Sequence, residues 1–188
     1  MKIKNIALVG NPNCGKTSLF NTLTGTRQKV ANYAGVTVER KEGSFKLPSG
    51  DAVRVLDLPG TYSLKPSSLD EEVTRAVCLG ELKGEVLPDI FICVVDATNL
   101  SLHLSLVLEV RALNRPMILV LNMMDEVKKR GISIDKDKLS QLLGIPVVEA
   151  VAVKTKGIQD LINQLDQKNL FITPYHSELS HFEQVKQI

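Results

Sequence analysis

The sequence has few aromatic residues, no tryptophan and almost no excess of charge. Phe, Trp and Tyr make up 4% of its 188 residues, which leaves few rings for stacking on nucleic-acid bases. The formal net charge is +2 at pH 7, so no strong field favours a polyanionic partner. Both features count against a protein that binds nucleic acid.

Long apolar runs are missing as well. The two longest, 90–95 and 117–121, fall far short of the roughly 18 residues that a membrane-spanning helix requires. The amino terminus lacks the apolar core of a signal peptide, and the three cysteines have no metal-ligand spacing. We therefore expect these residues to work in a reducing cytosol, as a soluble piece without a membrane span.

The residues that are present follow an alternating order of strands and helices. Apolar residues make up 44% and charged residues 23% of the chain, which is typical of a globular domain. Nearly continuous apolar runs predict buried strands at 3–9, 89–96, 117–121 and 146–153. Strands that alternate with helices predict an α/β fold with a largely parallel sheet.

Apolar spacing and capping residues place the helices between these strands. They predict helices from about Lys16 to Gly25, from Leu69 to about Lys83, from Asp135 to Gly144, and over Ile158–Leu165. Leucines in 100–106 alternate with other residues as in a strand, but leucine favours helices and two parallel strands need a crossover. We interpret this segment as a helix that begins near Thr98 or Asn99.

Two further extended runs, Arg40–Leu47 and Ala52–Leu58, are joined by the turn-forming residues 48–51 (PSGD). They predict an antiparallel hairpin. Residues 26–39 carry no clean period, which is typical of a functional loop. The complete expectation is an α/β fold with a largely parallel sheet of six strands, one antiparallel hairpin at its edge, and helices on both faces.

A glycine-rich motif follows the first predicted strand and opens the first helix. Residues 10–17, GNPNCGKT, match G-x-x-x-x-G-K-[ST]. In this motif backbone N–H groups surround the phosphates, the lysine reaches the β and γ phosphates, and the hydroxyl binds Mg²⁺. The candidate phosphate contacts are Gly10, Asn11, Pro12, Asn13, Cys14, Gly15, Lys16, Thr17 and Ser18. The helix N-terminus could lower the pKa of the Cys14 thiol, but we interpret Cys14 as a small filler.

The residues Asn122-Met123-Met124-Asp125, which follow the strand at 117–121, identify the base. A carboxylate only accepts hydrogen bonds, so Asp125 can accept from both N–H donors on the N1 and N2 edge of guanine. Adenine has an acceptor at N1 and would leave the carboxylate unpaired. Asn122 is expected to hold N7 and to tie this loop to the glycine-rich loop. The motif therefore predicts a guanine site.

Asp57-Leu58-Pro59-Gly60 is the third element of the predicted site. Asp57 is expected to bind the Mg²⁺ shell through water, and the Gly60 N–H to approach the γ phosphate. Taken alone, this stretch also fits a simple turn at a strand end. Thr37, in the loop without a period, is the candidate second hydroxyl ligand of Mg²⁺, and a solvated loop threonine is the alternative.

These motifs, in this order, are those of a translation-factor-related GTPase, and several stretches are more specific. They are residues 10–21 (GNPNCGKTSLFN), 35–43 (GVTVERKEG), 57–64 (DLPGTYSL), 95–100 (VDATNL) and 121–125 (LNMMD). Together they resemble the amino-terminal G domain of the ferrous iron transport protein B family, over about residues 1–170. The resemblance implies a Ras-like P-loop GTPase fold in a bacterial protein.

The resemblance also implies roles for loop residues. Switch I would contain Gly35, Val36 and Thr37, and switch II would run from Gly60 to about Leu69. The guanine-contacting loop falls on residues 150–154 (AVAVK), with Val151 where serine is usual. Its candidate contacts are Val151, Ala152 and Val153. Asn13 would hold a K⁺ ion that stabilises the developing charge, whereas the alternative is that Asn13 only braces its own loop.

We therefore expect slow GTP hydrolysis that K⁺ stimulates. Thr61 and Tyr62 follow Gly60, where many GTPases place the Gln that orients the attacking water. The candidate catalytic residues are Lys16, Asn13, Thr37 and Gly60. Two alternatives stay open: a soluble ribosome- or RNA-associated GTPase, and a nucleotide-dependent binding module that hydrolyses too slowly to matter.

The resemblance finally implies a larger protein around these residues. GTP and GDP states would control ferrous iron uptake by a bacterial transporter, with this domain on the cytoplasmic face of the inner membrane. Residues 1–170 would form the G domain, and residues 171–188, which include a capping-box pattern, a linker and the cut start of a helical domain. The expected partners are guanine nucleotide, the adjoining helical and transmembrane domains, and a second copy of the full-length protein.

Overall fold

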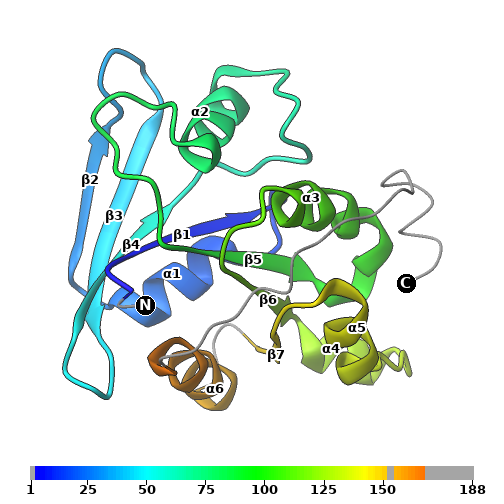
Figure 1. The fold of residues 1–188 in the computed structure, drawn as a ribbon. Helices are drawn as coiled ribbons and strands as arrows, with labels where there is room; N and C mark the ends of the chain where they lie inside the picture. The colour runs from blue at the N-terminus through cyan, green and yellow to red at the C-terminus, as the bar shows by residue number, and fades with distance from the viewer. Residues whose placement is uncertain (1–2, 152–154, 168–188) are drawn as a thin grey trace.

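The computed structural model describes residues 3–151 and 155–167, and Figure 1 shows their arrangement. The strands are β1 (Asn5–Gly10), β2 (Gln28–Asn32), β3 (Glu39–Lys46), β4 (Ala52–Asp57), β5 (Ile90–Asp96), β6 (Met117–Asn122) and β7 (Val147–Glu149). The helices are α1 (Lys16–Thr24), α2 (Leu69–Leu79), α3 (Leu100–Ala112), α4 (Met124–Lys129), α5 (Lys136–Leu143) and α6 (Thr155–Asp166), with a short 3-10 helix, η1, at Ala97–Asn99. The predicted linker and helical start at 171–188 lie outside the described residues.

These strands form one sheet in the order β2-β3-β4-β1-β5-β6-β7. β1 pairs in parallel with β4 and β5, and β6 pairs in parallel with β5 and β7. β3 is antiparallel to both β2 and β4. The carboxyl ends of β4, β1, β5, β6 and β7 therefore meet at one edge of the sheet, which is where α/β proteins bind ligands.

The sheet has one strand more than the predicted six, because β2 lies in the stretch that we expected to be only a loop. Four of the five residues of β2 are exposed, so the strand has no buried face that would produce an apolar period. Backbone pairing with β3 forms it instead, with Val30 opposite Lys41. The predicted hairpin of β3 and β4 is present, but β2 rather than this hairpin forms the edge.

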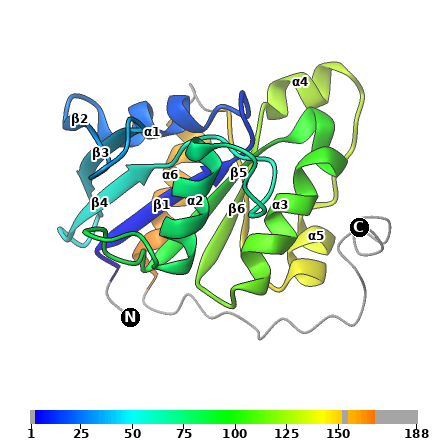
Figure 2. The same ribbon diagram turned by 90° about the horizontal axis from the view of Figure 1, so that it is seen from above.

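Helices cover both faces of the sheet, as predicted (Figures 1 and 2). α1 and α6 pack against one face through side chains that include Phe20 and Leu161. α2 and α3 pack against the other face, where Val77 and Leu104 join Tyr33 from the loop between β2 and β3. We call these the α1/α6 face and the α2/α3 face. Because β1 lies in the middle of the sheet, both layers fix the position of the loop that follows it.

Glycines end α1 and α5 where the sequence predicts their ends. Gly144 ends α5 in the left-handed conformation, with φ of 63°, and the ambiguous segment 100–106 is helical within α3. α2 ends at Leu79 rather than near Lys83, because Gly80 adopts a left-handed φ of 74°. Among the helices of residues 3–151 and 155–167, none is long and apolar enough to cross a membrane.

Candidate functional site

The loop between β1 and α1 has the tight backbone that a phosphate cradle needs. Asn13 and Gly15 adopt left-handed conformations with φ of 62° and 89°. A Cβ atom on Gly10 would lie 2.4 Å from the carbonyl oxygen of Val94, so β1 and β5 approach too closely there for a side chain. The loop leads directly into the N-terminus of α1, where backbone N–H groups and the helix dipole favour anions.

Two side chains in the first turn of α1 converge on one buried carboxylate from β4. Lys16 Nζ donates to Asp57 Oδ1 at 2.6 Å and also to the Leu58 carbonyl oxygen. The Thr17 hydroxyl donates to Asp57 Oδ2 at 2.9 Å. Lys16 is 8% exposed and Asp57 is 4% exposed, so each charge compensates the other where neither could be buried alone. The parallel pairing of β1 with β4 brings the two motifs together.

A pocket of about 280 Å³ opens beside this cluster. Its lining residues are Lys16, Thr17, Val38, Glu39, Lys41, Asp57, Leu58, Pro59, Gly60 and Asp70. The structure therefore joins the glycine-rich loop to Asp57-x-x-Gly60 around one cavity. Lys41, which lies in the stretch 35–43 but has no predicted role, and Asp70, which lies in no motif, also line the cavity.

Thr37 lies outside this cavity. It is exposed, and its neighbours Val38 and Glu39 line the pocket instead. The Tyr33 N–H donates to the Val38 carbonyl oxygen at 3.0 Å and closes the turn that contains Gly35, Val36 and Thr37. Of the predicted Mg²⁺ ligands, the structure thus brings Thr17 and Asp57 together and leaves Thr37 apart.

Gly60 begins its loop in direct contact with the glycine-rich loop. A Cβ atom on Gly60 would lie 3.1 Å from three atoms of Pro12. The Thr61 N–H donates to the Gly10 carbonyl oxygen at 3.2 Å. Thr61 is fully buried, and its hydroxyl donates to the Ser63 carbonyl oxygen at 2.6 Å.

Two glutamates that belong to no motif hold the rest of this loop. Glu109 on α3 accepts hydrogen bonds from the Ser63 hydroxyl at 2.9 Å and from the Leu64 N–H. Glu71 on α2 accepts from the Ser67 hydroxyl at 2.6 Å and from the Ser67 N–H at 2.8 Å. The bonds from Ser67, the hydroxyl first, lower the pKa of the Glu71 carboxyl. Only the fold identifies these two anchors.

Asn122 ties the base side of the site to the glycine-rich loop, as its motif predicts. Its Nδ2 donates to the Cys14 carbonyl oxygen at 2.9 Å. A Cβ atom on Gly15 would lie 2.0 Å from that nitrogen, so glycine is required there. Burial raises the pKa of the Cys14 thiol to about 11, which agrees with the interpretation of Cys14 as a filler.

The loops that follow β6 and β7, which the sequence predicts to contact the base, line a second pocket of about 560 Å³. Asp125 lines it together with Ala150 and Val151, and Met123 joins β6 to α4 with a left-handed φ of 61°. The last strand, expected over 146–153, is the short β7. Ala152 and Val153 lie outside the described residues.

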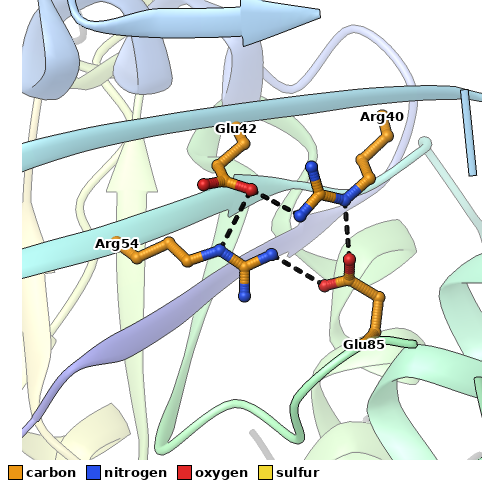
Figure 3. Close-up of polar contacts among 4 residues, drawn as sticks. All are labelled: Arg40, Glu42, Arg54 and Glu85. Atoms are coloured by element: carbon orange, nitrogen blue, oxygen red, sulfur yellow. Dashed lines mark hydrogen bonds and ion pairs between the residues drawn. The ribbon is translucent and has the colours of Figure 1, made fainter. Parts of the chain in front are cut away.

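Four alternating charges brace the strands beside the site (Figure 3). Arg40 on β3 and Arg54 on β4 each contact Glu42 and Glu85, which closes a ring. The Arg40 Nε lies 2.6 Å from Glu85 Oε1, and Arg54 lies 2.9 Å from the same carboxylate. Glu85 lies in the segment between α2 and β5, so the ring links this segment to β3, the strand that begins two residues after Thr37.

The fold and the arrangement of these motifs define a Ras-like P-loop domain of the GTPase class. The family model described as ferrous iron transport protein B matches residues 4–165. The chain belongs to this family. The Fe(2+) transporter FeoB of Salmonella typhimurium is 46% identical over 188 residues, which are 98% of this chain and 23% of the relative. The chain thus spans about a quarter of that protein.

Solved structures of the family have the same fold. The cytosolic domain of L. pneumophila FeoB has a TM-score of 0.84 and 41% identity, and the match covers 94% of this chain and 75% of that one. The cytosolic domain of T. maritima FeoB in its GMPPNP form has a TM-score of 0.80 and 44% identity, covering 88% and 65%. Its GDP form II has a TM-score of 0.83 and 44% identity, covering 92% and 67%.

Proposed function

We propose that this chain is a G domain that binds guanine nucleotide, hydrolyses GTP slowly, and switches between GTP and GDP states. One observation carries the proposal: Lys16 and Thr17 meet Asp57 on a pocket that adjoins the glycine-rich loop. A cation for phosphates and two oxygen ligands for a metal are thereby assembled at a helix N-terminus. The similarity to FeoB structures with GMPPNP and GDP supports guanine as the base.

The proposed roles follow from the placement of each side chain. Backbone N–H groups of residues 13–18 would hold the phosphates, with Lys16 at the β and γ phosphates. Gly60 would donate its N–H to the γ phosphate, and Asp125 would accept from the guanine edge. Asn122 holds the two halves of the site together.

The donor set fits Mg²⁺, which prefers hard oxygen ligands. Thr17 Oγ1 lies 2.9 Å from a carboxylate oxygen of the buried Asp57, so these two side chains would hold the ion, with Thr37 added if switch I closes over the pocket. When bound, Mg²⁺ neutralises phosphate charge as it develops. Asn13 is exposed on the glycine-rich loop and is the proposed ligand of a stimulating K⁺ ion.

A second candidate is a binding module whose hydrolysis is too slow to matter. It is favoured by Thr61, which follows Gly60 where a carboxamide would orient water. The Thr61 side chain is fully buried and its hydroxyl bonds to Ser63, so it is not positioned to hold the attacking water. Family membership removes the alternative of an RNA-associated GTPase.

For the whole protein, we propose regulation of ferrous iron transport. The relatives that carry this name are much longer, since 98% of this chain matches 23% of the Salmonella typhimurium protein. The G domain would end near residue 170 and residues 171–188 would begin a helical domain. The FeoB structures described as cytosolic domains support a position on the cytoplasmic face of the inner membrane. Self-association would belong to the full-length protein.

Single-turnover GTP hydrolysis tests the enzymatic proposal. The 188-residue chain would be compared in Na⁺ and K⁺ buffers with Asn13→Ala and Thr37→Ala variants beside it. We expect K⁺ to accelerate the parent, and each substitution to slow hydrolysis by about tenfold or more, as losses of transition-state stabilisation do.

The outcomes separate the parts of the proposal. Equal rates in Na⁺ and K⁺ would refute the role of Asn13, and GTP binding without hydrolysis in both buffers would favour the binding module. Equal competition by ATP would refute the assignment of Asp125 to guanine.

A further inference from the structure

Asn11, the first residue after β1, is an anomaly within the glycine-rich loop. Its side chain is 1% exposed, and neither its Nδ2 nor its Oδ1 has a hydrogen-bond partner among residues 3–151 and 155–167. A buried carboxamide without partners is costly, because it has given up its bonds to water. The phosphate motif specifies no side chain at residue 11, so it gives no reason for a buried amide there.

The neighbours of Asn11 show what could satisfy it. The preceding residue, Gly10, accepts a hydrogen bond from the Thr61 N–H at 3.2 Å. The following residue, Pro12, lies so close to Gly60 that a Cβ atom there would be 3.1 Å away. Asn11 is thus flanked on both sides by residues that touch the start of switch II.

The beginning of switch II is also the segment that the nucleotide would rearrange. This inference rests on the proposed function, in which the Gly60 N–H turns toward the γ phosphate of GTP. GDP has no γ phosphate to accept that hydrogen bond. In the described arrangement the Thr61 N–H and hydroxyl are bonded elsewhere, to Gly10 and Ser63. A turn at Gly60 would change the backbone that lies over the glycine-rich loop.

We propose that Asn11 is a positioning residue that favours the triphosphate-bound form without contacting the γ phosphate. Its carboxamide bonds the backbone of residues 60–61 when Gly60 faces a triphosphate and lacks these bonds otherwise. The unsatisfied amide raises the free energy of the arrangement described here and so favours the triphosphate-bound form. Asn11 touches no reacting atom in this scheme and acts through the position of switch II.

The test is the preference of the chain for GMPPNP over GDP, measured with fluorescent nucleotides. In Asn11→Leu an apolar side chain of similar size removes the unsatisfied groups, and Asn11→Ala serves if that variant does not fold. We expect the preference for GMPPNP to fall about tenfold in either variant, the size expected for one buried amide.

His103→Leu is the matched control, since His103 is 5% exposed and its Nδ1 has no partner within the described residues. Its preference should change less than about twofold.

A second readout follows the amide itself. In the parent chain, side-chain NMR should show the Nδ2 protons of Asn11 exchanging more slowly with GMPPNP than with GDP. An unchanged nucleotide preference, or an equal loss of affinity for both nucleotides, would overturn the proposal and assign Asn11 to holding its own loop. If the parent binds no guanine nucleotide, the proposed function itself fails, whereas normal binding with an unaltered preference refutes only the role of Asn11.

Discussion

Cys14 shows two opposing effects on one side chain. A helix N-terminus lowers the pKa of a thiol and burial raises it. Burial prevails here, because Cys14 is 1% exposed and its pKa rises to about 11. The thiol beside the phosphate loop is therefore inert at neutral pH.

This inertness can be tested by alkylation. All three cysteines are buried, and burial also raises the pKa of Cys78, to about 12, and of Cys93. At pH 8 the folded chain should incorporate no iodoacetamide over a time in which the urea-unfolded chain labels fully. Rapid labelling of Cys14 in the folded chain would show that the dipole outweighs burial.

His103 on α3 predicts a pH dependence of stability. Burial lowers its pKa from 6.5, opposed by the smaller effect of the Asp96 carboxylate. The unfolded chain then binds the proton more readily, so the stability from neutral His103 is complete above pH 6.5 and is lost as the pH falls through the lowered value.

Replacement of this side chain should flatten that dependence. Between pH 7 and 5, the urea midpoint of His103→Leu should fall less than that of the parent. The exposed substitution Asn32→Ala should follow the parent curve. Parallel curves for His103→Leu and the parent would contradict the assignment.

At the scale of elements, Gly157 sets how closely α6 approaches the base loop. A Cβ atom on Gly157 would lie 2.6 Å from the Glu149 carbonyl oxygen and 2.7 Å from the Ala150 Cα. Both are backbone atoms, so either the helix or the loop must shift. Gly157→Ala should destabilise the chain by about 1–3 kcal/mol, despite the better helix propensity of alanine.

Urea unfolding measures this loss, and GDP titration should show weaker binding. The matched control is Gln159→Ala on the exposed side of α6, which should stay within about 0.5 kcal/mol of the parent. Unchanged stability and GDP affinity in Gly157→Ala would show that the contact relaxes without effect.

The charge ring of Figure 3 gives a second prediction at this scale. The Glu85 side chain is 9% exposed and meets both Arg40 and Arg54. Glu85→Gln leaves the two arginines with only Glu42, and should cost about 1–2 kcal/mol at low salt and less at 0.5 M salt. Glu81→Gln is the control, because it removes a more exposed partner of Arg75. Its free energy of unfolding, measured in urea, should change by less than about 0.5 kcal/mol. A salt-independent loss would exclude the ion pairs as its cause.

The sequence predicts a strand or helix well where burial produces an apolar pattern or where a residue such as glycine marks its end. β5 and β6 are continuous apolar runs, and Gly144 and Gly80 end helices by their left-handed backbone. β2 has no such pattern, because backbone pairing with β3 holds it while its side chains face water. α2 is shorter than its charge and apolar pattern predict, because Gly80 ends it four residues after Ala76 with a left-handed backbone.

The residues of the site likewise include some that the sequence predicts and some that it does not. Lys16, Asp57 and Asn122 belong to motifs whose spacing already places them at strand ends, and the structure joins them. Glu109 and Glu71 hold the loop of the predicted switch II from two helices, and no local sequence pattern marks a residue that acts on a distant loop. The position of Thr37 also depends on how its loop folds, which its local sequence does not specify.

For the whole molecule, binding should appear as a gain in stability. A ligand at 100 times its Kd adds about 2.7 kcal/mol to the folded state, which raises the Tm of a chain of this size by about 5–10 °C. GDP with Mg²⁺ should produce this shift in thermal unfolding and ADP should not. Asp125→Ala should lose most of the GDP shift, and an equal shift with ADP would refute guanine selectivity.

The position of β2 at the edge of the sheet has a consequence for the reach of switch I. Thr37 lies on a short turn between two strands that are paired along all five residues of β2. These residues are mostly exposed, so unzipping β2 would uncover little apolar surface. At about 3.3 Å per residue, its release would give the loop about 16 Å more chain. β2 is thus a store of chain length that the sheet holds in this conformation, and Thr37 can use it only when Tyr33, which is 3% exposed between β2 and Thr37, leaves the core.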